Sequence, residues 1–81
     1  MKCYYVYILS SLKDKKCHYV GCTEDIEQRV REHNDGKCSH TSKYKPWNLE
    51  TYIVFTDKNK ALRFEKYLKS GSGRMFSIRH L

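Results

Sequence analysis

Two kinds of hydrophobic pattern alternate along the chain, and their order predicts a small mixed fold. Two segments, 24–34 and 58–69, carry apolar residues at helical spacing. Three shorter runs are rich in β-branched and aromatic residues and read as strands, at 4–9, 17–21 and 49–55. With a short terminal helix over 74–81, we expect the α+β class: a small three-stranded antiparallel sheet packed with helices, in the order β-β-α-β-α(-α).

Polar residues and glycines at the ends of these segments predict where each helix begins and stops. Thr23 is expected to cap the first helix, and Gly36 to stop it. Asp57 or Thr56 is expected to cap the second helix. The sequence SGSG at 70–73 then reads as a helix-breaking loop.

Length and charge limit the class of protein. A chain of 81 residues is expected to form one domain, spanning 1–81, with little surplus core. Its net charge of +7 favours a polyanionic partner, most simply nucleic acid, although a generic basic surface gives the same charge. DNA and RNA are both left open by the charge, and we expect a monomer without a small-molecule cofactor.

The four cysteines and the apolar runs bear on the compartment. No apolar run is long enough for a membrane span or a signal peptide, so we expect a cytoplasmic protein with reduced thiols and no membrane partner. A zinc cage of cysteine and histidine is disfavoured, because none of their spacings matches a zinc motif.

The first helix has an unusual inner face. At about 100° per residue from Ile26, Val30 falls at about 40°, His33 at about 340° and Arg29 at about 300°. His33 therefore lies within the apolar stripe and Arg29 flanks it, whereas Arg31, at about 140°, faces solvent. Either side chain alone is explained by packing at the edge of the core, with its polar end in water.

The second helix repeats this anomaly with an acid. Measured from Ala61, Leu62 falls at about 100° and Glu65 at about 40°, which places the carboxylate inside the buried arc. A buried glutamate requires a partner. The alternatives are an ion pair with Arg29 or a lysine, and a hydrated Mg²⁺ or Mn²⁺ whose shell phosphate oxygens complete.

Tyrosines supply a third element. Tyr5, Tyr7 and Leu9 share one face of the first strand, and Tyr19 in the paired strand is expected to lie near Tyr7. These phenols are either ordinary cross-strand packing or part of a site with the arginine, histidine and carboxylate. The second arrangement has the parts for phosphodiester hydrolysis.

In this order the residues resemble the GIY-YIG nuclease domain family, in particular small stand-alone proteins similar to the nuclease domain of bacterial excision-repair endonucleases. The resemblance covers almost the whole chain, with two departures: Tyr5 stands where many members have glycine, and no asparagine follows the glutamate. The matching positions are Tyr5-Val6-Tyr7, Tyr19-Val20-Gly21, Arg29, His33 and Glu65.

The resemblance implies a metal-dependent endonuclease that hydrolyses DNA, directed by structure or backbone and linked to DNA repair or processing. Glu65 is then the ligand of a single divalent cation, Mg²⁺ or Mn²⁺, and Tyr7 the general base or water-positioning group. Tyr19 orients water or phosphate, Arg29 stabilises charge on the phosphate, and His33 assists proton transfer or contacts the phosphate. The alternative is a nucleic-acid-binding module on the same fold with weak or lost catalysis.

A basic segment completes the candidate surface. Tyr44 or Trp47 is available to stack on an unpaired base, although Trp47 is better explained as a cap on the core. Backbone phosphates are the expected targets of five side chains: Lys37, His40, Lys43, Lys45 and Arg74.

Overall fold

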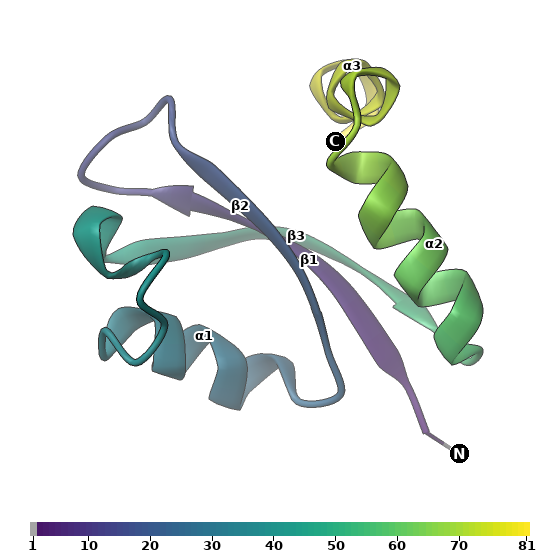
Figure 1. Cartoon of the computed structure of the whole chain (residues 1–81), viewed down its shortest axis with the longest axis horizontal. Coiled ribbons are helices and arrows are strands. Elements are labelled where there is room, and N and C mark those ends of the chain that lie inside the picture. The colour runs from purple at the N-terminus through teal and green to yellow at the C-terminus, as the bar shows by residue number, and fades with distance from the viewer. Residues whose placement is uncertain (1) are drawn as a thin grey trace.

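A computed structural model describes residues 2–81 and shows the expected three-stranded antiparallel sheet (Figure 1). The strands are β1 (Tyr4–Ser11), β2 (His18–Thr23) and β3 (Trp47–Phe55). Their spatial order is β2-β1-β3, so β1 is central and β2 is an edge strand. In the register of β1 with β2, Tyr7 lies opposite Gly21 and Leu9 opposite Tyr19. The predicted α+β class and element order are confirmed.

Alternation along β1 divides the protein into two small cores, because successive side chains point to opposite faces. On one face Tyr7, Leu9 and Trp47 are buried against α1 (Ile26–Asn34). On the other face Val6 and Ile8 pack against α2 (Lys58–Leu68), and Phe76 of α3 (Gly71–His80) joins this cluster. In Figure 1, α1 lies on one side of the sheet while α2 and α3 lie on the other.

The helix ends were predicted only in part. Gly36 has a φ of 77° at the predicted stop, and Asp57 caps α2 by accepting hydrogen bonds from two backbone N–H groups. The prediction for Thr23 was wrong. Asp25 caps α1, accepting from the N–H of Gln28, because Thr23 still belongs to β2.

The sequence SGSG is the start of α3 rather than a loop. Ser70 caps the helix by accepting a hydrogen bond from the N–H of Gly73. A Cβ on Gly73 would lie 2.5 Å from the Cα of Leu68, so only glycine lets α3 approach the end of α2 this closely. Leu62 was expected in the apolar set of α2, but it is 43% exposed.

Trp47 ties the basic segment to the sheet. Its indole N–H donates to the carbonyl of Thr41 at 2.9 Å, and the side chain of Asn34 hydrogen-bonds both the N–H and the carbonyl of Trp47. The segment between α1 and β3 includes a 3₁₀ turn, Ser42–Tyr44. Trp47 is 4% exposed, so the prediction that it caps the core is confirmed. Within residues 2–81, none of the helices is long and apolar enough to cross a bilayer.

Candidate active site

Gly21 lets the side chain of Tyr7 reach across β2. A Cβ at this position would lie 2.5 Å from Cζ of Tyr7, even closer to its hydroxyl oxygen, and 3.0 Å from the ring of Tyr19. The absence of a side chain therefore allows both tyrosine rings to pack over the glycine. The ring centroids of Tyr7 and Tyr19 are 6.3 Å apart, and that of Tyr19 lies 4.8 Å from that of His33.

The Tyr7 hydroxyl belongs to a chain of hydrogen bonds that runs from α1 into the basic segment. Arg29 Nε donates to Tyr7 Oη at 3.4 Å, and Tyr7 Oη lies 3.0 Å from His33 Nε2. His33 Nδ1 lies 2.8 Å from Thr41 Oγ1, and that hydroxyl donates to the carbonyl of Cys38 at 3.3 Å. Four side chains and one carbonyl thus form a single network.

The directions in this network follow from proton counting. With the Thr41 hydroxyl donating to the Cys38 carbonyl and the His33 proton on Nδ1, the Thr41 oxygen accepts from His33 Nδ1–H. Nε2 of a neutral His33 then carries no proton and accepts from Tyr7 Oη–H. The Tyr7 oxygen in turn accepts from Arg29.

Burial and charge fix the protonation states that this pattern requires. Burial, and secondarily the positive charge of Arg29, lowers the pKa of His33 below its usual 6.5. Burial raises the pKa of Tyr7 to about 12, although the hydrogen bond from Arg29 opposes the rise. The hydrogen bond to Tyr7 raises the pKa of Arg29 further. At neutral pH, His33 and Tyr7 are therefore neutral and Arg29 is a cation.

Exposure separates the residues that can contact a substrate from those that cannot. Tyr7 and His33 are both 0% exposed. The side chain of Arg29 is 37% exposed and also pairs with Glu32 at 3.2 Å, whereas Tyr19 is half-buried. Arg29 and Tyr19 thus form the accessible part of this cluster, and the others lie beneath them.

Glu65 lies on the opposite face of the sheet from Arg29. It projects from α2 toward β2, where its negative charge adds to burial in raising the pKa of the Cys22 thiol. Its side chain is 21% exposed, and its carboxylate pairs with Lys69 at 3.1 Å. Over residues 2–81, no hydrogen bond or ion pair joins Glu65 to Arg29. Of the two ion-pair alternatives, the pair with a lysine is therefore the observed one, and the pair with Arg29 is not.

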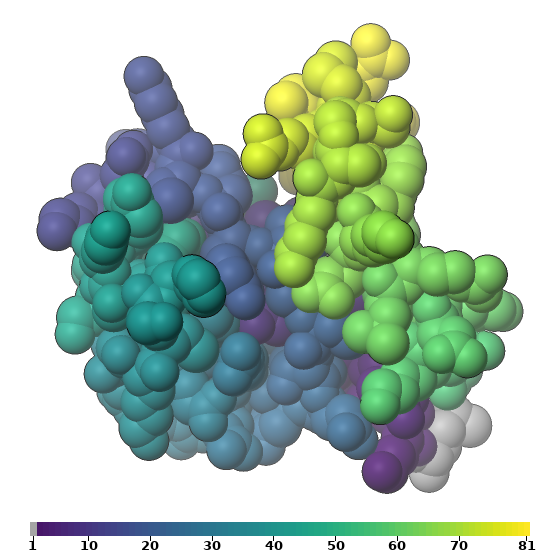
Figure 2. Space-filling model, viewed as in Figure 1, coloured from purple at the N-terminus to yellow at the C-terminus, as the bar shows by residue number. Residues whose placement is uncertain are grey.

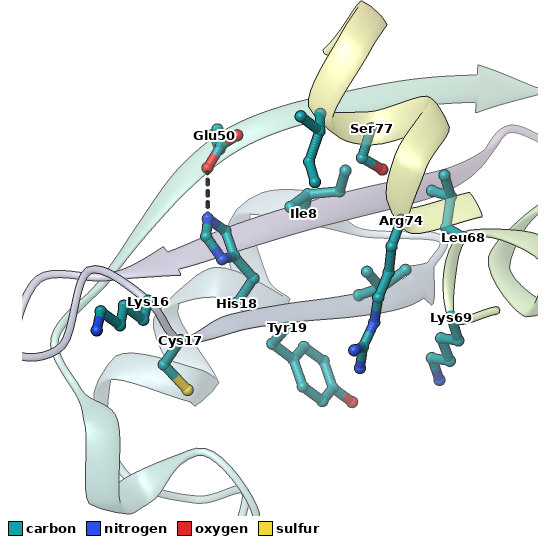
Figure 3. Close-up of a pocket in the computed structure, with 12 residues that line it drawn as sticks. Ile8, Lys16, Cys17, His18, Tyr19, Glu50, Leu68, Lys69, Arg74 and Ser77 are labelled. Carbon is teal, nitrogen blue, oxygen red and sulfur yellow. Dashed lines mark ion pairs between the residues drawn. The ribbon is translucent and has the colours of Figure 1, made fainter. Parts of the chain in front are cut away.

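The two halves meet at the edge formed by β2. In Figure 2 the blue atoms of this part of the chain lie in a hollow between a teal lobe and the green and yellow lobe of α2 and α3. Tyr19 lines a pocket there together with Lys69 and Arg74, whose side chain extends from α3 toward the tyrosine ring (Figure 3).

The predicted basic residues fall into two groups. Four are exposed on the segment between α1 and β3: Lys37, His40, Lys43 and Lys45. Arg74 is also exposed but lies on α3, so it belongs to the pocket and not to that segment. Sequence reasoning missed Thr41 and Glu32. Glu32 was detectable, because it lies three residues after Arg29 on the same helix.

The metal-ligating side chains of the site indicate which kind of metal ion it could bind. No group of three or more histidine, cysteine, aspartate or glutamate side chains gathers within residues 2–81. Glu65 is a single half-buried carboxylate. Mg²⁺ commonly binds through one or two carboxylates and completes its shell with water and substrate phosphate. The donor set therefore fits a hydrated Mg²⁺ or Mn²⁺ and does not fit a cage built from protein alone.

The sequence and the fold are similar to those of known proteins. The model of the GIY-YIG catalytic domain matches residues 3–77. The solution structure of a UPF0213 protein from Bacillus halodurans is 31% identical, with a TM-score of 0.58 over 95% of this chain and 83% of that chain. A UPF0213 protein of Bacillus licheniformis is 37% identical over 82% of this chain and 67% of its own length.

Longer proteins also match. The structure-specific endonuclease subunit SLX1 of Debaryomyces hansenii is 36% identical over 82% of this chain. The homologous subunit of Giardia intestinalis is 37% identical over 78% of it. The chain spans only about a fifth of the length of these two relatives, at 21% and 18%.

Proposed function

The chain belongs to the GIY-YIG catalytic domain family, and from that premise we propose that it is a metal-dependent endonuclease that hydrolyses DNA phosphodiester bonds. The observation that carries the proposal is the half-exposed Arg29, held by a buried tyrosine and histidine beside the open ring of Tyr19. The SLX1 relatives are named as structure-specific endonuclease subunits, which supports a DNA substrate recognised by its shape and a role in DNA processing or repair.

Arg29 contacts the phosphate in this proposal. Its guanidinium lies at the accessible edge of the cluster and remains charged at any physiological pH. Negative charge grows on the phosphate oxygens as a nucleophile attacks, so a fixed cation stabilises the transition state more than the ground state. The ion pair with Glu32 orients the guanidinium from the opposite side.

Tyr19, rather than Tyr7, is the tyrosine that contacts the attacking water. Tyr7 has no exposed surface, and ionising a phenol whose pKa is about 12 costs about 7 kcal/mol at pH 7. Tyr19 is half-buried, and its ring borders the pocket at the β2 edge. We therefore assign water orientation to the Tyr19 hydroxyl and the support of Arg29 to the Tyr7 hydroxyl.

His33 and Thr41 are positioning residues in this scheme. Thr41 fixes the His33 tautomer, and His33 Nε2 accepts a hydrogen bond from the Tyr7 hydroxyl. The Tyr7 oxygen therefore keeps a lone pair that accepts from Arg29. Each bond in this buried chain is individually modest, but together they hold one arginine rotamer. The predicted proton-transfer role of His33 becomes one of orientation.

In this proposal Glu65 would hold the divalent cation. For this, Lys69 would have to leave its ion pair with the carboxylate. The Lys69 side chain is 52% exposed, so it can turn into solvent at little cost. The bound cation would neutralise charge on the phosphate and lower the pKa of a bound water.

A cleavage screen tests the proposal. Purified protein is offered branched, nicked, single-stranded and blunt duplex DNA with Mg²⁺ or Mn²⁺, alongside Glu65→Gln and the exposed control Glu27→Gln. We expect nicking that requires the cation, survives in the control and is lost in Glu65→Gln. Binding without cleavage of any of these substrates would instead establish the alternative, a nucleic-acid-binding module with lost catalysis.

A further inference from the structure

A pocket of about 640 Å³ lies between β2 and α3, and Tyr19 forms part of its wall (Figure 3). Its lining combines aliphatic side chains from three elements, Ile8, Val20 and Leu68, with Ile78 of α3. Ile78 is 78% exposed, the most exposed of the large hydrophobic residues in the described chain. An apolar side chain left in water at the mouth of a pocket gains most if a ligand covers it.

Positive charge surrounds this apolar surface. Lys16, Lys69 and Arg74 line the pocket from the β1–β2 connection, the end of α2 and α3. Glu50 is the single acidic residue of the lining, and its carboxylate lies 3.4 Å from His18 Nε2. The pocket is therefore apolar inside and cationic at its rim, which suits a ligand with a flat apolar body and a phosphate.

We propose that this pocket binds an unpaired nucleotide of a single-stranded DNA segment, next to the phosphate that Arg29 contacts. The inference rests on the proposed function and names the substrate class of that site. Arg74 and Lys69 contact the phosphate of this nucleotide, and its base lies on the aliphatic lining against Ile78. Tyr19 then has the cleaved strand on one side and His33 on the other.

Size and base pairing select a single strand over a duplex. Pockets of about 300–1,000 Å³ hold ligands the size of a nucleotide. A base within a duplex is stacked and paired, and it enters such a pocket only after unpairing, which costs a few kcal/mol. An end, a gap or a flap supplies an unpaired base without that cost, so single-stranded segments are preferred.

Binding measurements in EDTA test the inference without any cleavage. The affinity of a fluorescent ten-nucleotide single strand and of the matching blunt duplex is measured by anisotropy for the whole chain and four variants of α3. Arg74→Gln and Ile78→Ser alter the pocket, and Arg79→Gln and Met75→Ser are matched controls on the same helix that do not line it. All four side chains are exposed, so the fold is retained.

We expect Arg74→Gln to weaken single-strand binding about tenfold and Ile78→Ser about fivefold, with the blunt duplex changed less than twofold. The controls should affect both DNAs alike. Equal losses for the two DNAs in the pocket variants, or no loss at all, would overturn the proposal. So would competition by thymidine monophosphate as strong as that of the ten-nucleotide strand, because the pocket would then serve free nucleotides.

The inference and the proposed function fail in different ways. If the pocket variants lose single-strand preference but the wild-type chain never cuts DNA, the pocket assignment stands and the endonuclease does not. If the chain cuts DNA through Glu65 while the pocket variants bind normally, the endonuclease stands and the pocket assignment is wrong.

Discussion

Replacing Gly21 with alanine tests the geometry on which the whole site depends. The new Cβ would lie 2.5 Å from Cζ of Tyr7, whereas ordinary contacts begin at 3.4 Å, so the ring must retreat by about 1 Å. Tyr7 is completely buried, so its ring can retreat only by displacing the side chains around it. Its hydrogen bonds to His33 and Arg29, at 3.0 and 3.4 Å, do not survive a shift of that size.

The cost has two parts. Forcing a methyl group into a packed interior costs about 1–3 kcal/mol, and the lost hydrogen bonds add about 1 kcal/mol each. We expect the free energy of unfolding to fall by about 3–5 kcal/mol. Cleavage should fall about 100-fold even at temperatures where the variant is folded, because the guanidinium of Arg29 loses its support.

Urea denaturation and single-turnover cleavage measure the two effects separately. Gly71→Ala is the matched control, since a Cβ there meets nothing within 4 Å, and its stability should be unchanged or slightly increased. If Gly21→Ala retains wild-type stability and cleavage rate, Tyr7 does not pack across Gly21 and the assignment of Tyr7 as a support for Arg29 is wrong.

Three further predictions follow from the same network and from the helix packing. Thr41→Val keeps the side-chain shape but removes the acceptor for His33 Nδ1–H. Cleavage should therefore fall about tenfold while DNA affinity stays constant, and a cleavage rate equal to that of the wild type would show that the tautomer does not matter. Burial lowers the pKa of His33, so on acidification the unfolded chain binds a proton at this residue at higher pH than the folded chain does. Stability and activity should therefore both decline as pH falls below about 6.5, and a His33→Gln variant should lack this contribution in pH-dependent melting. Gly73→Ala places a methyl group against the backbone of Tyr67 and Leu68, so the melting temperature should drop more than in Gly21→Ala, where side chains can yield; a smaller drop would mean that α3 is not closely docked.

Much of the fold was predictable from the sequence because its signals are local. Period-two alternation in β1 assigned Val6 and Tyr7 to opposite faces, and both faces are as expected. Asp57 caps α2 and Gly36 has a positive φ after α1, both at the positions predicted from the sequence. Thr23 and Asp25 are equally good caps, so the choice between them depends on where β2 ends, which is set by its pairing with β1.

The site was harder to predict because its contacts are long-range. Helical geometry places Glu65 on the inner side of its helix, but it does not say which face of the sheet that helix covers. The sequence therefore left open whether Glu65 pairs with Arg29, with a lysine or with a metal ion. Thr41 lies in a polar segment without periodicity, and only the folding of that segment over Trp47 brings it to His33. The burial of Tyr7 likewise depends on Gly21, in a different strand.

We assign the hydroxyl of the half-buried Tyr19 a direct part in hydrolysis, together with Arg29. Single-turnover cleavage by Tyr19→Phe tests it most directly, because the variant loses one oxygen and keeps the ring that packs against Gly21 and His33. We predict a loss of at least about 100-fold in cleavage rate, with melting temperature and DNA affinity unchanged. A cleavage rate within twofold of the wild type would show that the Tyr19 hydroxyl takes no part in hydrolysis.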